Sequence, residues 1–585
     1  MAPALIRDAF IGDVLYHVSG HRLFQHPEDR SGFTIPTPPR SVKSTASRSS
    51  SHSNLDTFTV IERPDDEESR LPRVDSDQVT ITVPEASEEQ RTMQWKAPEV
   101  EEGDLAKEKE KSSVMQEIAE SRIVEWYGPN DSENPQNWSL AKKSFVTFQV
   151  CLLTFSVYIG SAIYSPGIDE IAAQFGVSPV AATLGLTLFV VGYGIGPMFL
   201  SPLSELPQIG RTTVYILSLA LFVVLQVPTA LAKNLGALLP LRFVAGFAGS
   251  PALATGGASL SDVWAPEHRA VVIGLWSVAG ISGPVLGPLL GGFATQGEDW
   301  TWTIWILLWM SGATLVFLTL FFPETSASAL LYRRAARLRR VTEDSRLKSE
   351  GEIEVEHMTV GDIAMMHLVR PFILMFVEPI VAFWNIYIAL VYGILYIFIE
   401  SFRVVFVEKH GFNLGENGLA FLGIFAGTII TFAFFAPYAL RVLKPKFVDN
   451  TFVPEMRLPI AFVGSVLLPI SMFWFGWTSS ASVHWIVPII ASAFFSAGTY
   501  MLFQAGLNYL ADCYPRYVAS VLAGNDFFRS MVGAAFPLFS TAFFHNLGVG
   551  PACSILGGVA VLMLPIPWIL HRYGARIRSW SKYAN

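Results

Sequence analysis

The sequence predicts an all-α integral membrane protein in which twelve membrane-spanning helices form two six-helix halves. Three observations predict this fold class. The 585 residues are 51% hydrophobic and only 15% charged, with a mean hydropathy of +0.40, far above that of soluble proteins. Apolar windows of about 20 residues, the length that crosses about 30 Å of hydrocarbon, recur through most of the chain. A hydrophilic segment then divides these windows six and six.

The twelve windows follow one another closely, with short polar connections inside each half. An even division by a basic linker favours two parallel halves related by an axis normal to the membrane, an architecture typical of alternating access. An arbitrary helical bundle with one long loop is the alternative. The expected spans are about 143–166, 180–203, 211–232, 238–261, 269–293, 302–323, 372–399, 415–439, 459–478, 485–510, 517–543 and 549–570.

The first 141 residues are expected to be acidic and largely disordered. Residues 30–120 are rich in Ser, Pro, Glu and Asp and poor in aromatics, so they cannot bury enough apolar surface to offset the entropy of ordering. Before them, an interfacial helix can form with one apolar face made of Leu5, Ile6, Phe10, Val14 and Leu15, and a frayed terminus is the alternative. The expected regions are 1–141 (N-terminal region), 142–323 (N-terminal half), 324–370 (linker), 371–571 (C-terminal half) and 572–585 (tail).

Lysine and arginine residues in short loops predict the orientation. The loops on the linker side carry Arg211, the run "YRRAARLRR" at 332–340 and several more basic residues, whereas the opposite loops carry few. Because cytoplasmic loops hold the excess of Lys and Arg, both termini are expected in the cytoplasm.

The stretch "GLWSVAGISGPVLGPLLGG" at 274–292 is uncharged and full of helix breakers. In lipid such a helix survives only where neighbouring helices cover it. Gly283, Gly287 and Gly291 recur every four residues and form a smooth ridge for close helix packing, and the prolines beside the ridge should bend the helix. A purely structural packing helix remains the alternative.

The spacing of this stretch resembles the antiporter signature in the fifth span of major facilitator drug:proton exporters. "SPLSELPQIGR" and "FFPETSASALLYRRAARLR" are similar to the fungal twelve-span branch, which includes fluconazole and benomyl resistance transporters of Candida and yeast. The resemblance covers about 126–572. It implies a major facilitator fold, a plasma-membrane location, and a fifth span lying where the two halves meet. The signature residues are Gly274, Gly283, Gly287, Pro288, Gly291 and Gly292.

Three ionisable residues within or beside the spans are candidates for proton coupling. Because a charge in the bilayer is costly, an ionisable residue there is taken first as a candidate functional residue. By resemblance, Arg242 occupies the position of a family arginine implicated in proton transfer; a snorkelling side chain is the alternative. Glu378 begins the seventh span, and Asp526 lies in the eleventh. A carboxylate in a low-dielectric cavity suits alternate protonation and release. Asp526 and Arg529, at i and i+3, can also simply neutralise each other.

A second charged set combines Glu205 and Arg211, which correspond by resemblance to the family's gating loop after span two, with Asp262 and Arg269, which flank the loop after span four. The gating loop usually reads Gly-x-x-x-Asp-Arg-x-Gly-Arg, whereas this chain has Ser201, Glu205 and Leu206 at the first Gly, the Asp and the first Arg. We expect a charge network that holds the halves closed at this end, with solvated loop charges as the alternative. The candidates are Glu205, Arg211, Asp262 and Arg269.

Aromatic residues with scattered hydrogen-bonding groups in spans seven, ten and eleven are candidates for a substrate cavity. Such surfaces accept varied flat, hydrophobic compounds by stacking and area burial. Aromatics that face lipid or pack inside the fold are the alternative at each position. The candidates are Tyr387, Tyr392, Tyr396, Phe495, Tyr500, Gln504, Asn525 and Phe528.

The sequence lacks a G-x-x-x-x-G-K-[ST] phosphate loop, an H-E-x-x-H metal site and a G-x-S-x-G nucleophile elbow, so we expect a transporter without cofactor or metal and not an enzyme. Its expected partners are protons, small hydrophobic substrates and the lipid bilayer, with no nucleic acid, and it is expected to be a monomer. Three functions remain open: a proton-coupled multidrug exporter, an exporter dedicated to an endogenous toxic metabolite, and a nutrient sensor that does not transport.

Overall fold

The computed structural model of the chain describes residues 6–29, 33, 40–41, 122–356, 358–359, 361–362, 365–449, 451–515, 517–581 and 583–584. The predicted disorder of residues 30–120 lies outside these ranges, apart from 33 and 40–41. Helices account for nearly all of the described chain after residue 139.

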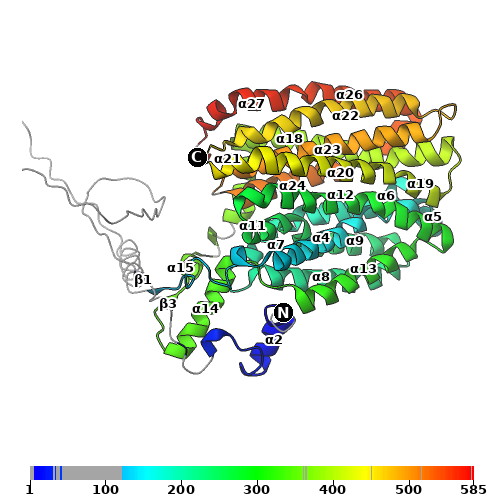
Figure 1. Cartoon of the computed structure of the whole chain (residues 1–585). Coiled ribbons are helices and arrows are strands. Elements are labelled where there is room, and N and C mark those ends of the chain that lie inside the picture. Colours follow the sequence, from blue (N-terminus) through cyan, green and yellow to red (C-terminus); the bar gives the residue numbers. More distant parts are fainter. Residues whose placement is uncertain are drawn as a thin grey trace, which may run out of the picture. The chain divides into compact units, whose positions relative to one another are not determined.

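Two groups of helices, cyan to green and yellow to red in Figure 1, correspond to the two halves. The N-terminal half contains α4 (Leu140–Ala162), η3 (Ser165–Gly167), α5 (Ile168–Phe175), α6 (Pro179–Ile195), α7 (Pro197–Glu205), α8 (Gly210–Ala230), α9 (Leu235–Gly249), α10 (Pro251–Ala254), α11 (Gly256–Val263), α12 (Pro266–Gly297) and α13 (Thr301–Phe321).

The C-terminal half repeats this up-and-down arrangement. It contains α17 (Arg370–Val377), α18 (Pro379–Phe402), η5 (Arg403–Lys409), α19 (Leu414–Ala420), α20 (Leu422–Tyr438), η6 (Ala439–Leu443), α21 (Lys444–Val448), η7 (Pro454–Arg457), α22 (Leu458–Thr478), α23 (Ile486–Cys513), α24 (Val518–Ala535), α25 (Pro537–Leu547), α26 (Val549–Met563) and α27 (Pro565–Arg578).

Each of the twelve predicted spans coincides with one helix or with a broken helix. By length and composition, ten helices among the described residues are apolar enough to cross a membrane, or eleven if α24 and α25, bent by 45° at their junction, count as one. The fourth span is divided into α9, α10 and α11, with Pro251 at the start of α10. Proline lacks the N–H that an unbroken helix requires, so it divides this span.

Local sequence signals begin several of these helices. The side chain of Ser139 accepts the backbone N–H of Lys142 at the start of α4, and Ser178 caps α6 ahead of Pro179. Asn413 and Glu416 form a reciprocal capping box at the start of α19. These caps satisfy N–H groups that have no partner within the helix.

The end of the bundle at which α13 continues into α14 (Ala327–Thr342) is called the linker end here, and the opposite end, near α5 and α19, is called the far end. The linker also contains β3 (Leu347–Lys348), α15 (Glu350–Glu356) and η4 (Met365–Val369). Before the bundle come α2 (Phe10–Val18), η1 (Pro27–Asp29), β1 (Arg40–Ser41), β2 (Arg122–Ile123) and η2 (Pro135–Asn137); β2 pairs in parallel with β3.

A helix, and not a frayed end, forms near the N-terminus. Helix α2 packs against α8 and α13, with Gly12 and Tyr16 buried. Of the predicted apolar face, Phe10 packs against the main core, Ile6 and Leu15 are half-buried and Val14 is exposed, whereas Leu5 lies outside the described residues.

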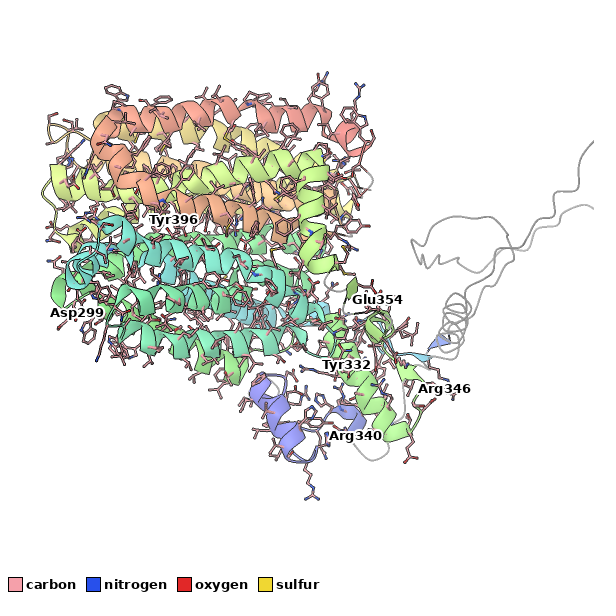
Figure 2. All side chains as sticks on the ribbon, turned by 180° about the vertical axis from the view of Figure 1, so that it is seen from behind. Asp299, Tyr332, Arg340, Arg346, Glu354 and Tyr396 are labelled. Atoms are coloured by element: carbon pink, nitrogen blue, oxygen red, sulfur yellow. The ribbon has the colours of Figure 1, made fainter. Side chains whose placement is uncertain are left out.

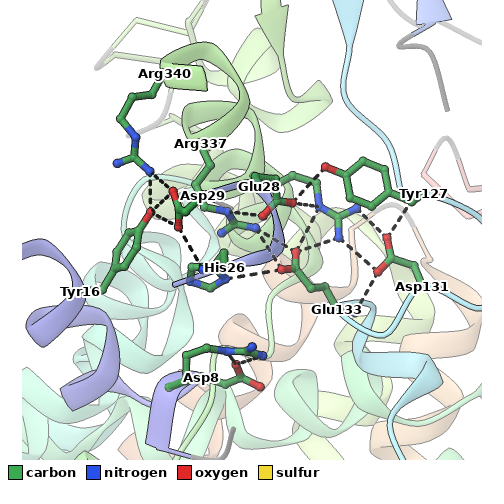
Figure 3. Close-up of polar contacts among 12 residues, drawn as sticks. Asp8, Tyr16, His26, Glu28, Asp29, Tyr127, Asp131, Glu133, Arg337 and Arg340 are labelled. Atoms are coloured by element: carbon green, nitrogen blue, oxygen red, sulfur yellow. Dashed lines mark hydrogen bonds and ion pairs between the residues drawn. The ribbon is translucent and has the colours of Figure 1, made fainter. Parts of the chain in front are cut away.

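Residues 6–29, residues 122–139 and α14 together form a polar assembly that we call the N-terminal clamp (Figure 3). Arg334 of α14 is fully buried and donates to Asp131 at 2.6 Å and to Glu133 at 2.8 Å. Arg337 donates to Glu28, which is also buried, at 3.1 Å. Burial would raise the pKa of Glu133, but the neighbouring His26, Arg337 and Arg334 outweigh burial and hold that pKa well below its ordinary value.

Replacing Arg334 with leucine is expected to loosen the N-terminal clamp. The change removes the arginine partner of Asp131 and leaves Glu28 and Glu133 with Arg337. Breaking a buried ion pair typically costs about 3–5 kcal/mol. Hydrogen exchange of residues 122–139 in the full-length protein should accelerate by about a hundredfold or more. The matched control is Arg346→Leu, whose guanidinium is half exposed and bonds to Asp344; equal exchange in the two variants would contradict the clamp's dependence on Arg334.

Candidate functional site between the two halves

Three buried tyrosines join the two halves at the centre of the bundle. The hydroxyl of Tyr193, on α6, lies 2.5 Å from that of Tyr392 and 3.0 Å from that of Tyr396, both on α18. Figure 2 labels Tyr396 inside the bundle. Tyr392 and Tyr396 were candidates for the substrate cavity, whereas Tyr193 was not, because nothing in its local sequence separates it from an aromatic that only packs.

A buried ion pair adjoins these tyrosines. Arg529 donates to Asp526 through Nε at 2.9 Å, and a second bond runs from its Nη2 to the same oxygen. The guanidinium lies 5.1 Å from the ring centre of Tyr392 and reaches across to the Tyr158 hydroxyl of the N-terminal half at 3.3 Å. The pair expected at i and i+3 is thus formed inside the bundle, and it is tied to both halves.

The remaining cavity candidates divide by position. Tyr500 donates to the backbone oxygen of Gly274 at 3.1 Å, across the two halves. Tyr387 and Phe495 pack within the C-terminal half, against Trp384 and Phe398. Gln504 accepts from Asn508 on its own helix, Asn525 donates to Asn385 on α18, and Phe528 is half-buried. Only some of the predicted set therefore lies at the boundary between the halves.

Polar contacts also join the halves at both ends. At the far end, Ser165 donates to Glu400 at 2.9 Å, Gln296 accepts the N–H of Gly415 at 3.0 Å, and Arg403 pairs with Asp169. At the linker end, Lys444 lies 3.0 Å from the ring nitrogen of His268. None of these residues stood out in the sequence as a functional candidate, although Glu400 ends an apolar run and the cost of a charge in the bilayer applies to it as it does to Arg242.

The glycine ridge of α12 faces its own half, so the ridge is not the part of the fifth span that meets the opposite half. A Cβ on Gly283 would lie 2.6 Å from the Cβ of Tyr158 on α4, and one on Gly287 would lie 2.7 Å from the backbone nitrogen of Ile163, the C-cap residue of α4. The expectation that the fifth span lies where the halves meet holds for α12 as a helix, since it also contacts α19 and α20. Gly292, against the backbone of Leu414, and Gly274, against Phe435 and Tyr500, are the signature glycines that meet the C-terminal half.

Arg242 is fully buried, so the snorkelling alternative is wrong. Its guanidinium donates to the backbone oxygens of Gly160 at 2.7 Å and Gly185 at 3.1 Å and lies over the rings of Tyr164 and Phe189. Its described partners are thus backbone carbonyls and aromatic faces, and no carboxylate is among them. The arginine joins α4, α6 and α9 inside the N-terminal half.

Part of the predicted gating set meets at the linker end, but Arg211, on α8, and Asp262, on α11, both belong to the N-terminal half, so their bond does not join the two halves. Arg211 donates to Asp262 at 2.7 Å, and its backbone N–H donates to Glu324 at 3.1 Å. Arg269 donates instead to the backbone oxygen of Trp264, and among the described residues no hydrogen bond to Glu205 is found. Sequence analysis missed Glu324, and it also missed the matching pair in the C-terminal half, in which Arg457 donates to Asp512 at 2.8 Å.

Glu378 lies at the linker end of α18, where its carboxylate accepts the Tyr514 hydroxyl at 2.9 Å. It is buried but is not among the partners of Asp526. The two carboxylates proposed for proton coupling therefore occupy different positions along the bundle.

Comparison with known proteins identifies the family. Residues 150–537 match the family described as Major Facilitator Superfamily. The chain is 50% identical to Transporter mfs1 of Schizosaccharomyces pombe (79% of this chain, 88% of the relative), 43% identical to Fluconazole resistance protein 1 of Saccharomyces cerevisiae (79% and 85%), and 42% identical to the citrinin biosynthesis cluster MFS transporter mrr1 of Monascus ruber (79% and 92%).

The solved structures agree on the fold. The proton:xylose symporter XylE of E. coli, bound to 6-bromo-6-deoxy-D-glucose, superimposes with a TM-score of 0.54 at 15% identity, over 74% of this chain and 96% of XylE. The two halves of six spans therefore form a known transporter fold, and the alternative of an arbitrary helical bundle is wrong. The chain belongs to the Major Facilitator Superfamily and is a multi-pass membrane transporter.

Proposed function

We propose that this protein exports hydrophobic drugs, fungicides or toxins across the plasma membrane in exchange for protons. The observation that carries the proposal is the buried Asp526–Arg529 pair, which touches Tyr158 of the opposite half within a major facilitator fold. A carboxylate in this position can change its charge as the halves separate. The relative named for fluconazole resistance supports a hydrophobic drug as substrate.

The proposed cycle moves segments 142–323 and 371–571 as two bodies, with both termini in the cytoplasm and the protein acting as a monomer. Asp526 is the first candidate for the proton, with Glu378 second and Arg242 as a fixed cation. Arg211 and Asp262 hold the linker end, with Glu205 and Arg269 nearby. Contacts at both ends and the centre of the boundary support this arrangement, since each must break and re-form as access alternates.

Accumulation of a rhodamine dye or a fluorescent azole in an efflux-deficient yeast tests the proposal. Cells that express the protein should hold less dye than cells with an empty vector, and a protonophore should remove the difference. Equal accumulation in both strains would favour a sensor that binds without transport. Dye export that a protonophore leaves unchanged would rule out the proton as the driving ion.

An exporter dedicated to an endogenous toxic metabolite is the second candidate. The identity of 42% to a transporter encoded with citrinin biosynthesis supports it. The same fold and the same boundary contacts serve either function, so only substrate breadth separates them. A panel of unrelated hydrophobic toxins, each tested for protection of the expressing yeast, should show wide protection for a multidrug exporter and protection against one chemical class for a dedicated one.

A further inference from the structure

Two asparagines meet inside the C-terminal half, where apolar residues dominate both helices. Asn385 lies on α18 and Asn525 on α24, and each is only 1% exposed. The Nδ2 of Asn525 donates to the Oδ1 of Asn385 at 2.7 Å. Only Asn525 stood out in the sequence; Asn385 lies between aromatic and branched residues and carried no signal of its own.

The pair leaves one donor and one acceptor unused. Within the part of the chain that the structure describes, neither the Nδ2 of Asn385 nor the Oδ1 of Asn525 has a hydrogen-bond partner. The conclusion does not depend on how the amides are oriented: if both are flipped, the bond reverses and the pair again offers one N–H group and one oxygen. Polar atoms buried without a partner are costly, so a partner in another state of the transporter is expected.

The position of the pair connects it with the boundary between the halves. Asn385 precedes Tyr392 by seven residues, so these two side chains lie on the same side of α18. Asn525 precedes Arg529 by four residues and likewise shares one side of α24 with it. Tyr392 and Arg529 touch each other and reach Tyr193 and Tyr158 of the N-terminal half. The pair thus lies one to two helical turns nearer the linker end along that seam.

The next residue strengthens this placement. Asp526 is only 5% exposed, and its Oδ2 also lacks a hydrogen-bond partner among the described residues. The Oγ of Ser530, one turn further, is unpartnered as well, and the Ser530 side chain contacts Gly194 of α6. Unused polar atoms are therefore concentrated on α24 beside the surface that separates when the halves move.

We infer that Asn385 and Asn525 form a recognition site for an amide or imide group of the transported compound. A lactam, imide or ureide presents an N–H donor next to a carbonyl acceptor, and this order complements the free amide N–H and the free amide oxygen of the pair. Aromatic side chains favour flat, apolar compounds, whereas this pair of asparagines additionally requires an amide or imide group in the compound. The inference rests on the proposed export function, and it names a substrate class for that function.

Two matched probes test the site: cycloheximide, whose glutarimide ring offers N–H and C=O, and its N-methyl derivative, which lacks the N–H. Rhodamine 123 serves as the amide-free probe. In efflux-deficient yeast, the wild-type protein should export cycloheximide about tenfold better than the N-methyl derivative, because the methyl group leaves a buried acceptor unpaired. Asn385→Leu and Asn525→Leu should each reduce the preference for cycloheximide over its N-methyl derivative from about tenfold to less than about twofold.

Asn417→Leu is the matched control. Asn417, on α19, is also buried with an unpartnered amide oxygen but lies near the far end, so this variant should keep the preference of the wild type. The inference is overturned if the wild type exports rhodamine 123 without preferring the imide, or if the asparagine variants, present at normal levels in the membrane, lose all probes equally. Absence of export of every probe by the wild type would overturn the proposed function and this inference with it.

Discussion

Replacing Gly287 with leucine is expected to abolish transport, because α4 and α12 can no longer pack. A Cβ at this position would lie 2.7 Å from the backbone nitrogen of Ile163 and 3.0 Å from the carbonyl carbon of Ala162. These are backbone atoms, which cannot turn aside as a flexible side chain can. Even Gly287→Ala should destabilise the N-terminal half by about 1–3 kcal/mol, the usual range for overpacking.

The matched control lies on the same helix. A Cβ on Gly280 would be 3.9 Å from its nearest neighbour, the ring of Tyr158, so Gly280→Ala should be tolerated. Both alanine variants and Gly287→Leu can be compared by size-exclusion chromatography in detergent, by thermal unfolding and by dye export. A monodisperse Gly287→Leu protein with wild-type export would show that the packing of α12 on α4 is not required.

The glycine ridge of α12 was predictable from the sequence, but its packing partner was not. The four-residue spacing correctly predicts a face for close helix packing, because that property belongs to one helix. It does not say which helix packs there, and both α4 and the opposite half were compatible with the same pattern. Only the structure separates Gly287, which faces α4, from Gly292, which faces Leu414 of the opposite half.

The spans themselves were predictable for a related reason: apolar length is a local property, and all twelve predicted spans coincide with helices or broken helices. The partners of charged residues were not. Glu28 and Arg337 are 309 residues apart in sequence, and Arg211 and Glu324 are 113 apart. Arg242 was singled out by the cost of a charge in a membrane, but that cost does not distinguish a carboxylate partner from the backbone carbonyls of Gly160 and Gly185.

Asp526→Asn is expected to have the second large effect, because it removes the charge that compensates Arg529. Both side chains are buried, so the variant should lose about 3–5 kcal/mol of stability, the usual cost of breaking a buried ion pair. The bond from Arg529 to Tyr158 should weaken with it, since the guanidinium is no longer held in place by the carboxylate. Thermal unfolding in detergent measures the first effect.

A double variant, Asp526→Asn with Arg529→Gln, separates the two roles of the pair. If the charges only neutralise each other, removing both should recover most of the lost stability and also restore export, because no unpaired charge remains in the bundle. If Asp526 carries the proton, the double variant should recover stability but fail to accumulate substrate against a gradient in proteoliposomes with an imposed pH difference. If the Asp526→Asn variant still exports substrate with the wild-type dependence on the pH difference, Asp526 is excluded as the proton carrier. Glu378, which lies beside Tyr514, would then be the next carboxylate to test.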